Sequence, residues 1–352
     1  MQYRLLGNSG LKVSQLTLGT MTFGGEGFMS KVGNTDVDDA RRLIDTAIDH
    51  GVNIFDTANM YSGGLSEEIL AKALGDKRND VLLATKVRFP MGEGPNEGGL
   101  SRLHIREQVE ASLKRLNTDH IDLYQLHMWD GQTPLEETLQ TLDTLVGHGK
   151  IRYYGISNFS AWQAMKVMQV CERHGFTKPI SQQIHYTAHT RDAEYELMPM
   201  AHDQGLGTMI WSPLAGGLLS GKYRRDQDQP EGTRFADGWD EPPIHDEKRL
   251  FDIIETLVEV GEAHGVSAAQ VALAWITGRQ GVTTAVIGAR KQHQLEDNLA
   301  AADLELSNNE IERIEQVSRP PLLYPYWHQR KTVADRFGPA DMVLHAAHLA
   351  DA

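Results

Sequence analysis

The segment IRYYGISNFSAWQAMKVMQVCERHGFTKPISQQ, residues 151–183, contains one complete strand–helix–strand unit. It begins with a short apolar and aromatic run and ends on another. Between the two runs, Ser160 and Gln163 have the spacing of a capping box, which begins helices, and Gly175 stands where helices end. Strands joined by such a crossover helix run parallel. This unit therefore predicts a parallel α/β architecture.

The same alternation continues along almost the whole chain. Eight short runs rich in apolar and β-branched residues are candidate strands, at 15–18, 53–55, 81–85, 121–126, 151–155, 180–183, 208–211 and 284–287. Helical apolar spacing lies between them, for example at 40–48, 105–116, 135–146 and 250–260. The capping-box spacing recurs at Thr133/Glu136, Ser267/Gln270 and Ser307/Glu310.

Eight such units fit either a closed barrel or an open doubly wound sheet. An open dinucleotide-binding sheet shows GxGxxG directly after its first strand. Here the first strand ends in Leu18-Gly19-Thr20-Met21, and the glycines at 24–27 lack that pattern. We therefore expect a (β/α)₈ barrel that forms a single domain over residues 1–352. Two irregular excursions are expected, at 224–247 and in a tail from 318 to 352.

Composition narrows the classes of function. The formal net charge of −14 disfavours nucleic acid and anionic membrane surfaces as partners. The one cysteine, Cys171, excludes an intrachain disulfide. The first residues lack the apolar run of a signal peptide, and no stretch is apolar for long enough to span a bilayer. We expect a cytoplasmic protein that acts on a small molecule.

Ionisable residues stand at the ends of three successive candidate strands. Asp56 ends one strand, with Tyr61 five residues later, Lys86 ends the next, and His127 follows the third. Because barrels of this kind place their active sites at the carboxyl ends of the strands, we expect the four side chains to meet. Each alone also fits a simple structural role in a turn, on the surface or in the core. The set together indicates an active site.

These four groups suit proton transfer. A tyrosine, with a pKa of about 10, is a weak acid at neutral pH, and an adjacent ammonium should lower that pKa. We therefore assign Tyr61 as the acid and Lys86 as the group that tunes it. Asp56 would anchor the lysine, and a neutral His127 would orient the substrate oxygen.

The motifs together resemble the aldo-keto reductase family over nearly the full length of the chain. They are FDTA at 55–58 with Tyr61, ATK at 84–86, LH at 126–127, GISNF at 155–159, Gln183 with Tyr186, WSPLAGGL at 211–218, and IGAR at 287–290 through Asn298. The resemblance implies a (β/α)₈ barrel with an N-terminal β-hairpin and an irregular C-terminal tail. It further implies reversible, NADPH-dependent reduction of an aldehyde or ketone to an alcohol by direct hydride transfer. The family's catalytic tetrad falls on Asp56, Tyr61, Lys86 and His127.

The resemblance also implies a cofactor site for NADPH or NADP⁺. Ser157, Asn158 and Gln183 resemble the residues that bind the nicotinamide carboxamide, and Trp211 occupies the position that stacks on its ring. Arg290 would meet the 2′-phosphate, a role that suits its planar guanidinium. The remaining expected cofactor-binding positions are Gly19, Thr20, Met21, Asp56, Ser212, Pro213, Leu214, Gly217, Lys222, Arg234, Gly288, Gln294, Asp297 and Asn298.

Aromatic residues near the strand ends and in the tail are candidate substrate contacts: Phe23, Phe89, Trp129, Tyr326 and Trp327. Packing of loops onto the barrel explains each of them equally well. A rim of this kind favours a hydrophobic or ring-bearing carbonyl compound.

Four other interpretations bear on function. Residues 216–222 match GxxxxGK, but Tyr223 stands where a triphosphate-binding loop needs Ser or Thr. His185 and His189 lack a third ligand, so we expect no metal. The potassium-channel β subunits share the barrel, the tetrad and bound NADPH, so a regulatory or redox-sensing subunit with low turnover is the alternative function. A Schiff-base aldolase acting through Lys86 is a further one.

Overall fold

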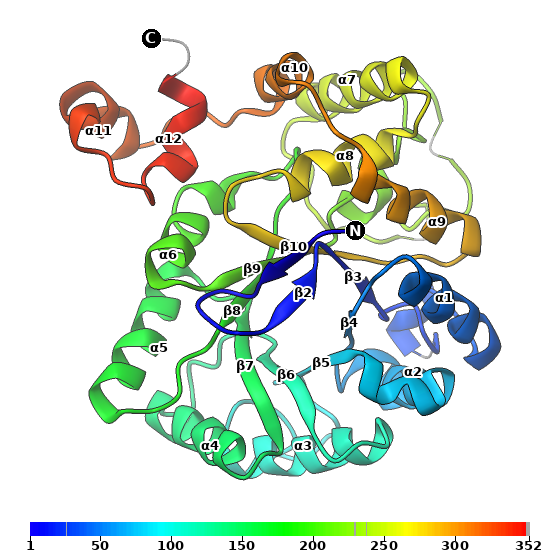
Figure 1. Cartoon of the computed structure of the whole chain (residues 1–352), viewed down its shortest axis with the longest axis vertical. Coiled ribbons are helices and arrows are strands. Elements are labelled where there is room, and N and C mark those ends of the chain that lie inside the picture. The colour runs from blue at the N-terminus through cyan, green and yellow to red at the C-terminus, as the bar shows by residue number, and fades with distance from the viewer. Residues whose placement is uncertain (26, 229, 237, 350–352) are drawn as a thin grey trace.

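Eight parallel strands close into a barrel with helices around it, which confirms the expected (β/α)₈ fold (Figure 1). The computed structural model describes residues 1–25, 27–228, 230–236 and 238–349. Each barrel strand pairs with its neighbours in the chain, and the last strand pairs with the first. The strands are β3 (Leu16–Gly19), β4 (Ile54–Asp56), β5 (Leu82–Val87), β6 (Ile121–Leu126), β7 (Ile151–Ser157), β8 (Ser181–His185), β9 (Gly207–Trp211) and β10 (Val282–Ile287).

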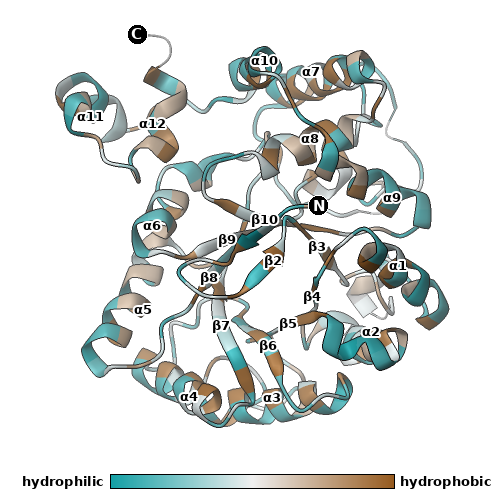
Figure 2. Cartoon of the chain, in the orientation of Figure 1, coloured by the Kyte–Doolittle hydropathy of each residue, from teal (hydrophilic) through white to brown (hydrophobic). Residues whose placement is uncertain are grey.

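Helices cover the outside of the barrel, and much of their outward surface is hydrophilic, while many residues of the barrel strands are hydrophobic (Figure 2). They are α1 (Val37–Asp49), α2 (Leu65–Leu74), α3 (Arg102–Arg115), α4 (Leu135–Gly147), α5 (Ala161–His174), α6 (Leu197–Gln204), α7 (Glu247–His264), α8 (Ala268–Thr277), α9 (Gln292–Ala300) and α10 (Asn308–Ser318). None of the described helices is long and apolar enough to cross a membrane.

Two of the four expected capping boxes form. The Ser160 amide donates to Gln163 Oε1 at 2.8 Å, and the Ser307 amide donates to Glu310 Oε2 at the same distance. At α8 only half of the box exists, because the Gln270 side chain donates to Asp297 instead. The box expected at Thr133 is wrong.

Helix α4 begins one residue later than that box predicts. Its N-cap is Pro134, and the Thr133 hydroxyl donates to Asp130 Oδ2 at 2.7 Å. A competing acceptor close in sequence has therefore taken the hydroxyl that would have capped the helix.

A layer of buried apolar side chains fills one end of the barrel: Leu6, Val13, Ile54, Ala84, Leu123, Met209 and Val286. Side chains two residues apart on a strand point to the same face. Asp56 and Lys86, which follow Ile54 and Ala84 by two residues, therefore also point into the barrel, one layer nearer the carboxyl end. The strand pattern alone thus places polar side chains above an apolar floor.

The expected N-terminal hairpin supplies part of that floor. Strands β1 (Tyr3–Leu5) and β2 (Lys12–Ser14) pair antiparallel and lie across the end of the barrel (Figure 1). Leu6 and Val13, both fully buried, join the apolar layer from this hairpin. Among the described residues, this end of the barrel is therefore closed by apolar side chains.

The C-terminal tail is partly helical, which corrects the expected irregular structure. Helices α11 (Tyr326–Val333) and α12 (Met342–Leu349) stand outside the barrel beyond α6 and α10 (Figure 1). The Tyr326 hydroxyl donates to Glu196, and the Tyr195 hydroxyl donates to the Pro321 carbonyl. These bonds hold the tail on the outer surface. The excursion at 224–246, by contrast, has no regular helix or strand among its described residues, as expected.

A buried ion network ties α10 to the barrel. Arg191, which is fully buried in the loop after β8, donates to Glu194 Oε1 at 2.9 Å and to Glu315 Oε2 at 2.8 Å. Arg279 also donates to Glu315, and both guanidiniums lie over the Trp275 ring. Charges buried in this way are stable only while they remain paired.

We expect Glu315→Ala to lower the free energy of unfolding by about 3–5 kcal/mol, because two buried guanidiniums lose a shared partner. Urea unfolding measures the change. The control is Glu312→Ala, which removes a partly exposed pair with Arg319 and should cost at most about 1 kcal/mol. Equal losses in the two variants would show that the buried network does not stabilise the fold.

Candidate active site

A cavity of about 880 Å³ opens at the carboxyl ends of the barrel strands. Its walls contain the strand-end residues Gly19, Asp56, His127 and Trp211, together with Tyr61 from the loop after β4. The expected site at this end of the barrel therefore coincides with a real cavity.

Lys86 is the centre of the polar cluster at the bottom of the cavity. Its fully buried Nζ donates to Asp56 Oδ2 at 2.5 Å, to the Thr57 carbonyl at 2.8 Å and to the Tyr61 hydroxyl at 3.4 Å. Lys86 itself lies behind the cavity wall, whereas Tyr61 is part of it. The tyrosine hydroxyl thus connects a buried ammonium to the open space.

Two glutamines orient the Asp56 carboxylate. Gln125 Nε2 and Gln183 Nε2 donate to Asp56 Oδ1 at 2.8 and 2.9 Å, which leaves Oδ2 for Lys86. Gln183 was expected at the cofactor, while Gln125 was not anticipated at all. The sequence could have predicted that Gln125 points into the barrel, because it follows the inward-facing Leu123 by two residues.

His127 borders the cavity, and one of its ring nitrogens lies buried without a partner. Its Nδ1 is buried and has no hydrogen-bond partner, and its ring packs edge-on against Phe89 and Tyr61, with ring centroids 4.9 and 5.9 Å away. Burial and the charges of Lys86 and Arg88 hold the pKa of His127 well below its ordinary value. The imidazole is therefore neutral at pH 7, in the form that can orient a substrate oxygen.

The pKa of Tyr61 differs in direction from the expectation. Burial raises it above the ordinary phenol value, and this effect outweighs the opposing charge of Lys86. For Lys86, burial lowers the pKa, but Asp56 and Tyr61 more than offset that and raise it overall. The protein alone thus holds a protonated tyrosine beside a protonated lysine.

Trp211 is held by Asn158 at one end of the cavity. The indole Nε1 donates to Asn158 Oδ1 at 2.9 Å, and Asn158 Nδ2 donates to the His127 carbonyl at 3.0 Å. The fully buried Ser157 lies behind, where its hydroxyl accepts a second bond from Asn158 Nδ2. His185 packs against the Trp211 ring with centroids 4.5 Å apart.

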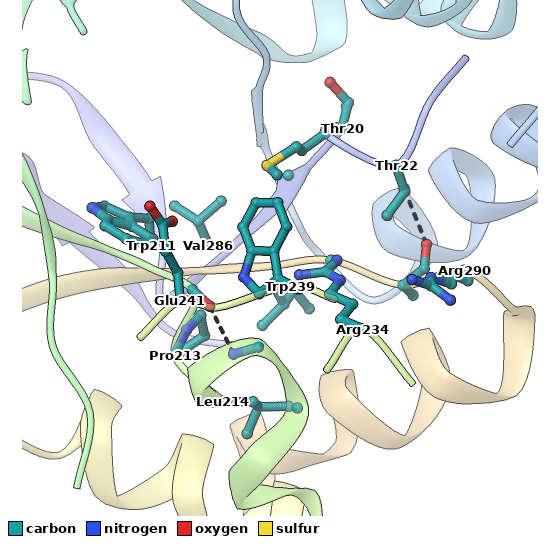
Figure 3. A pocket seen from close by; sticks show the side chains of 18 of the residues that line it. Thr20, Thr22, Trp211, Pro213, Leu214, Arg234, Trp239, Glu241, Val286 and Arg290 are labelled. Atoms are coloured by element: carbon teal, nitrogen blue, oxygen red, sulfur yellow. Dashed lines mark hydrogen bonds between the residues drawn. The ribbon is translucent and has the colours of Figure 1, made fainter. Parts of the chain in front are cut away.

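The opposite end of the cavity is basic. Arg234 and Arg290 lie together there, far from Trp211 (Figure 3). Arg290 donates from Nε to the Val32 carbonyl and from Nη2 to the Lys31 carbonyl, both at 2.7 Å. Burial and the neighbouring Arg290 lower the pKa of Arg234 to about 10. In the part of the chain that the structure describes, no carboxylate pairs with either guanidinium.

The other expected cofactor positions also border the cavity. They are Gly19, Thr20, Met21, Ser212, Pro213, Leu214, Gly217, Lys222, Gly288, Gln294, Asp297 and Asn298. The Asp297 carboxylate accepts bonds from Ser267 and Gln270, so α8 already engages it.

Trp239 and Glu241 were missed by the sequence analysis. Both lie in the excursion at 224–246, and Trp239 stands between the Trp211 end and the arginine end of the cavity (Figure 3). The Trp239 amide donates to the Arg234 carbonyl at 2.9 Å, which closes a turn within this excursion. The sequence feature that could have indicated Trp239 is its position as an aromatic residue in a Gly- and Pro-rich segment.

Only one of the five expected substrate contacts borders the cavity. Phe89 does so, next to His127. Phe23 is buried in the core, and Trp129 packs edge-on against Phe159 and Trp162. Tyr326 and Trp327 belong to the tail helices outside the barrel. None of these four side chains borders the cavity, so we do not propose them as substrate contacts.

Comparisons with known proteins agree with this geometry. Residues 15–319 match the sequence profile of the Aldo/keto reductase family. An "uncharacterized oxidoreductase YrpG" of Bacillus subtilis (strain 168) is 39% identical over 333 residues, which cover 91% of this chain and 97% of that protein. A "probable voltage-gated potassium channel subunit beta" of Oryza sativa subsp. japonica is 38% identical, with coverages of 90% and 96%. A "versiconal hemiacetal acetate reductase" of Aspergillus parasiticus is 34% identical, with coverages of 92% and 99%.

The depressed pKa of His127 predicts a specific pH dependence of stability. Below the unfolded pKa of about 6.5, the unfolded state binds a proton that folded His127 rejects, so stability falls as the pH drops. Between the two pKa values, we expect wild type to lose about 1.4 kcal/mol per pH unit relative to His127→Gln. Urea unfolding of both proteins at about pH 5 and 7.5 measures this. An unchanged difference between the proteins would mean that folding does not shift the pKa of His127.

Proposed function

The chain belongs to the aldo/keto reductase family, and we propose that it reduces an aldehyde or ketone to an alcohol with NADPH, in a reversible reaction. The observation that carries the proposal is the Tyr61 hydroxyl, which lies 3.4 Å from Lys86 Nζ and opens onto a cavity shared with His127. The family supports an oxidoreductase that acts on a small-molecule carbonyl compound. The cofactor and the residue roles are our inference.

The residues of the cavity fit NADPH. Neither of the two neighbouring arginines has a carboxylate partner among the described residues, and the charge of Arg290 disfavours the charged form of Arg234. A bound phosphate would relieve this repulsion and accept hydrogen bonds from both guanidiniums. We assign the 2′-phosphate to Arg290 and Arg234, and the pyrophosphate to Gly217 and Lys222. The nicotinamide would lie against Trp211, near Asn158. When bound, the cofactor supplies the hydride.

The protein's part is to bind, orient and protonate the carbonyl. Tyr61 is the proton donor to the oxygen, and the neutral His127, which borders the same cavity, orients that oxygen. As Tyr61 gives up its proton, the ammonium of Lys86 stabilises the phenolate at 3.4 Å. Asp56 keeps that ammonium in place.

The same lysine argues against an aldolase. A Schiff-base lysine must be a free amine, and proteins obtain one by lowering its pKa. Here Asp56 and Tyr61 raise the pKa of Lys86 despite its burial, so the group remains an ammonium. We therefore favour the reductase.

A second candidate function comes from the comparisons. Relatives from Oryza sativa, Arabidopsis thaliana and Schizosaccharomyces pombe are named as probable or putative potassium channel β subunits, at 35–38% identity. A regulatory NADPH-binding subunit would keep the cofactor contacts and show low turnover. The rate of carbonyl reduction by the wild-type protein separates the two functions.

We expect Arg290→Ala to raise the Kd for NADPH about 10- to 100-fold, because a charge-assisted hydrogen bond contributes about 1.5–3 kcal/mol. The Kd for NADH should change less than about twofold, since NADH lacks the 2′-phosphate. Quenching of tryptophan fluorescence measures both. Arg313→Ala removes an exposed arginine paired with Glu259 and is the control. Equal losses for the two nucleotides would place the 2′-phosphate elsewhere.

We expect Tyr61→Phe to lower kcat for carbonyl reduction at least about 100-fold, the typical contribution of a positioned acid. The Kd for NADPH should stay within about twofold, because the phenol ring remains in the cavity wall. Steady-state oxidation of NADPH with an aromatic aldehyde measures kcat. Turnover at the wild-type rate would transfer the acid role to another group.

A further inference from the structure

The loop that carries Tyr61 has an unusual backbone. It forms the short helical segment η2 (Tyr61–Gly64) and leads directly into α2. Ser62, Gly63 and Gly64 follow one another with φ angles of 50°, 64° and 101°. Glycine adopts positive φ readily, but a non-glycine residue such as Ser62 persists there only where its surroundings hold it. The contacts of this loop therefore determine where the Tyr61 hydroxyl lies.

The first turn of α2 is anchored to three barrel strands. The Ser66 hydroxyl donates to the Thr20 carbonyl at 2.8 Å and lies 3.1 Å from the Thr57 hydroxyl, at the ends of β3 and β4. The next residue, Glu67, reaches β5, where its Oε1 accepts a bond from the Thr85 hydroxyl at 2.6 Å.

Glu67 is a buried carboxylate outside the cavity. Its exposure is 0%, and its second oxygen accepts a bond from Arg115 Nε of α3 at 2.6 Å. A buried charge of this kind is costly unless both oxygens are bonded. Because Thr85 adjoins Lys86 on β5, the carboxylate joins the loop of the tyrosine to the strand of the lysine.

Arg115 also packs against η2 itself. A Cβ added at Gly64 would lie 2.8 Å from Arg115 Cδ, so the arginine fills the space beneath the last residue of the segment. Arg115 thus contacts both the Glu67 carboxylate of α2 and Gly64, the last residue of η2. Neither side chain borders the cavity.

We propose that the Glu67–Arg115 ion pair positions Tyr61 for the reaction, by fixing η2 against Thr85 and so setting the distance from the Tyr61 hydroxyl to Lys86 Nζ. This inference rests on the proposed reductase function. Glu67 and Arg115 are positioning residues, because they act through Thr85 and η2 and touch no reacting atom.

The test is Glu67→Gln, which keeps the shape of the side chain and removes its charge. We expect kcat to fall at least about tenfold, since small misplacements of catalytic groups cost up to about 100-fold, while the Kd for NADPH changes less than about twofold. The matched control is Glu315→Gln, a buried carboxylate outside the cavity that also accepts from arginines, but from Arg191 and Arg279 rather than from Arg115. This control should lose stability and keep its kcat.

A second readout does not need turnover. The Tyr61 hydroxyl is faced by Lys86 from β5, Asp56 from β4 and His127 beyond β6. Burial raises the pKa of Tyr61 and Lys86 lowers it, so a displaced loop should shift the ionisation of Tyr61 away from its wild-type pH. Ultraviolet difference titration of each protein against its Tyr61→Phe counterpart measures that shift, and in reduction the alkaline limb of kcat should move the same way.

The outcomes are distinguishable. Wild-type protein that reduces no carbonyl would overturn the proposed function, and the Tyr61 titration would still decide the positioning role. Glu67→Gln with unchanged Tyr61 titration, or with a kcat loss no larger than its loss of NADPH binding, overturns the positioning role. If that variant does not fold, Thr85→Val replaces it. A kcat reduced about threefold with intact NADPH binding supports the inference, and an unchanged kcat overturns it.

Discussion

The ion pair between Lys86 and Asp56 is the constraint on which the carboxyl end of this barrel depends. Its side-chain exposures are 0% and 4%, and moving two charges so far from water costs several kcal/mol for each ion unless the surroundings compensate. Gln125 and Gln183 compensate at one oxygen of Asp56, while the Thr57 carbonyl and the Tyr61 hydroxyl accept from the lysine. Strands β4, β5, β6 and β8 must therefore remain in one register.

The loops above this cluster divide the cavity by charge. The Trp211 end is bordered by aromatic rings and a neutral imidazole, while the Arg290 end is cationic. Segments that follow the two strands flanking β10 meet over the cationic end. A Cβ at Gly238 would lie 3.6 Å from Lys31 Nζ, and Arg290 donates to the carbonyls of Lys31 and Val32. The excursion after β9 and the loop after β3 together roof this part of the cavity.

Much of this arrangement could be predicted from the sequence, because it depends on period and spacing. Alternation by two placed Asp56 and Lys86 inside the barrel, and the strand ends brought Tyr61 and His127 to the same cavity. The pKa of Tyr61 could not be predicted in the same way, since its direction depends on how much burial offsets Lys86.

Contacts between residues that lie far apart in the sequence could not be predicted from the sequence pattern either. Tyr326 and Trp327 look like rim aromatics in a list of residues, yet Glu196 holds the tail on the outer surface. Trp239 was hidden in a segment without periodicity, and its place in the cavity wall depends on a turn closed by the Arg234 carbonyl. Thr133 does not cap α4, because its hydroxyl donates to the competing acceptor Asp130.

The N-terminal hairpin has a consequence for how ligands enter and leave the cavity. Because Leu6 and Val13 close the amino end of the barrel, the cavity opens at the carboxyl ends of the strands. A molecule bound near this opening would lie in the path of one bound deeper in the cavity, and it would slow the release of that molecule without contacting a catalytic group.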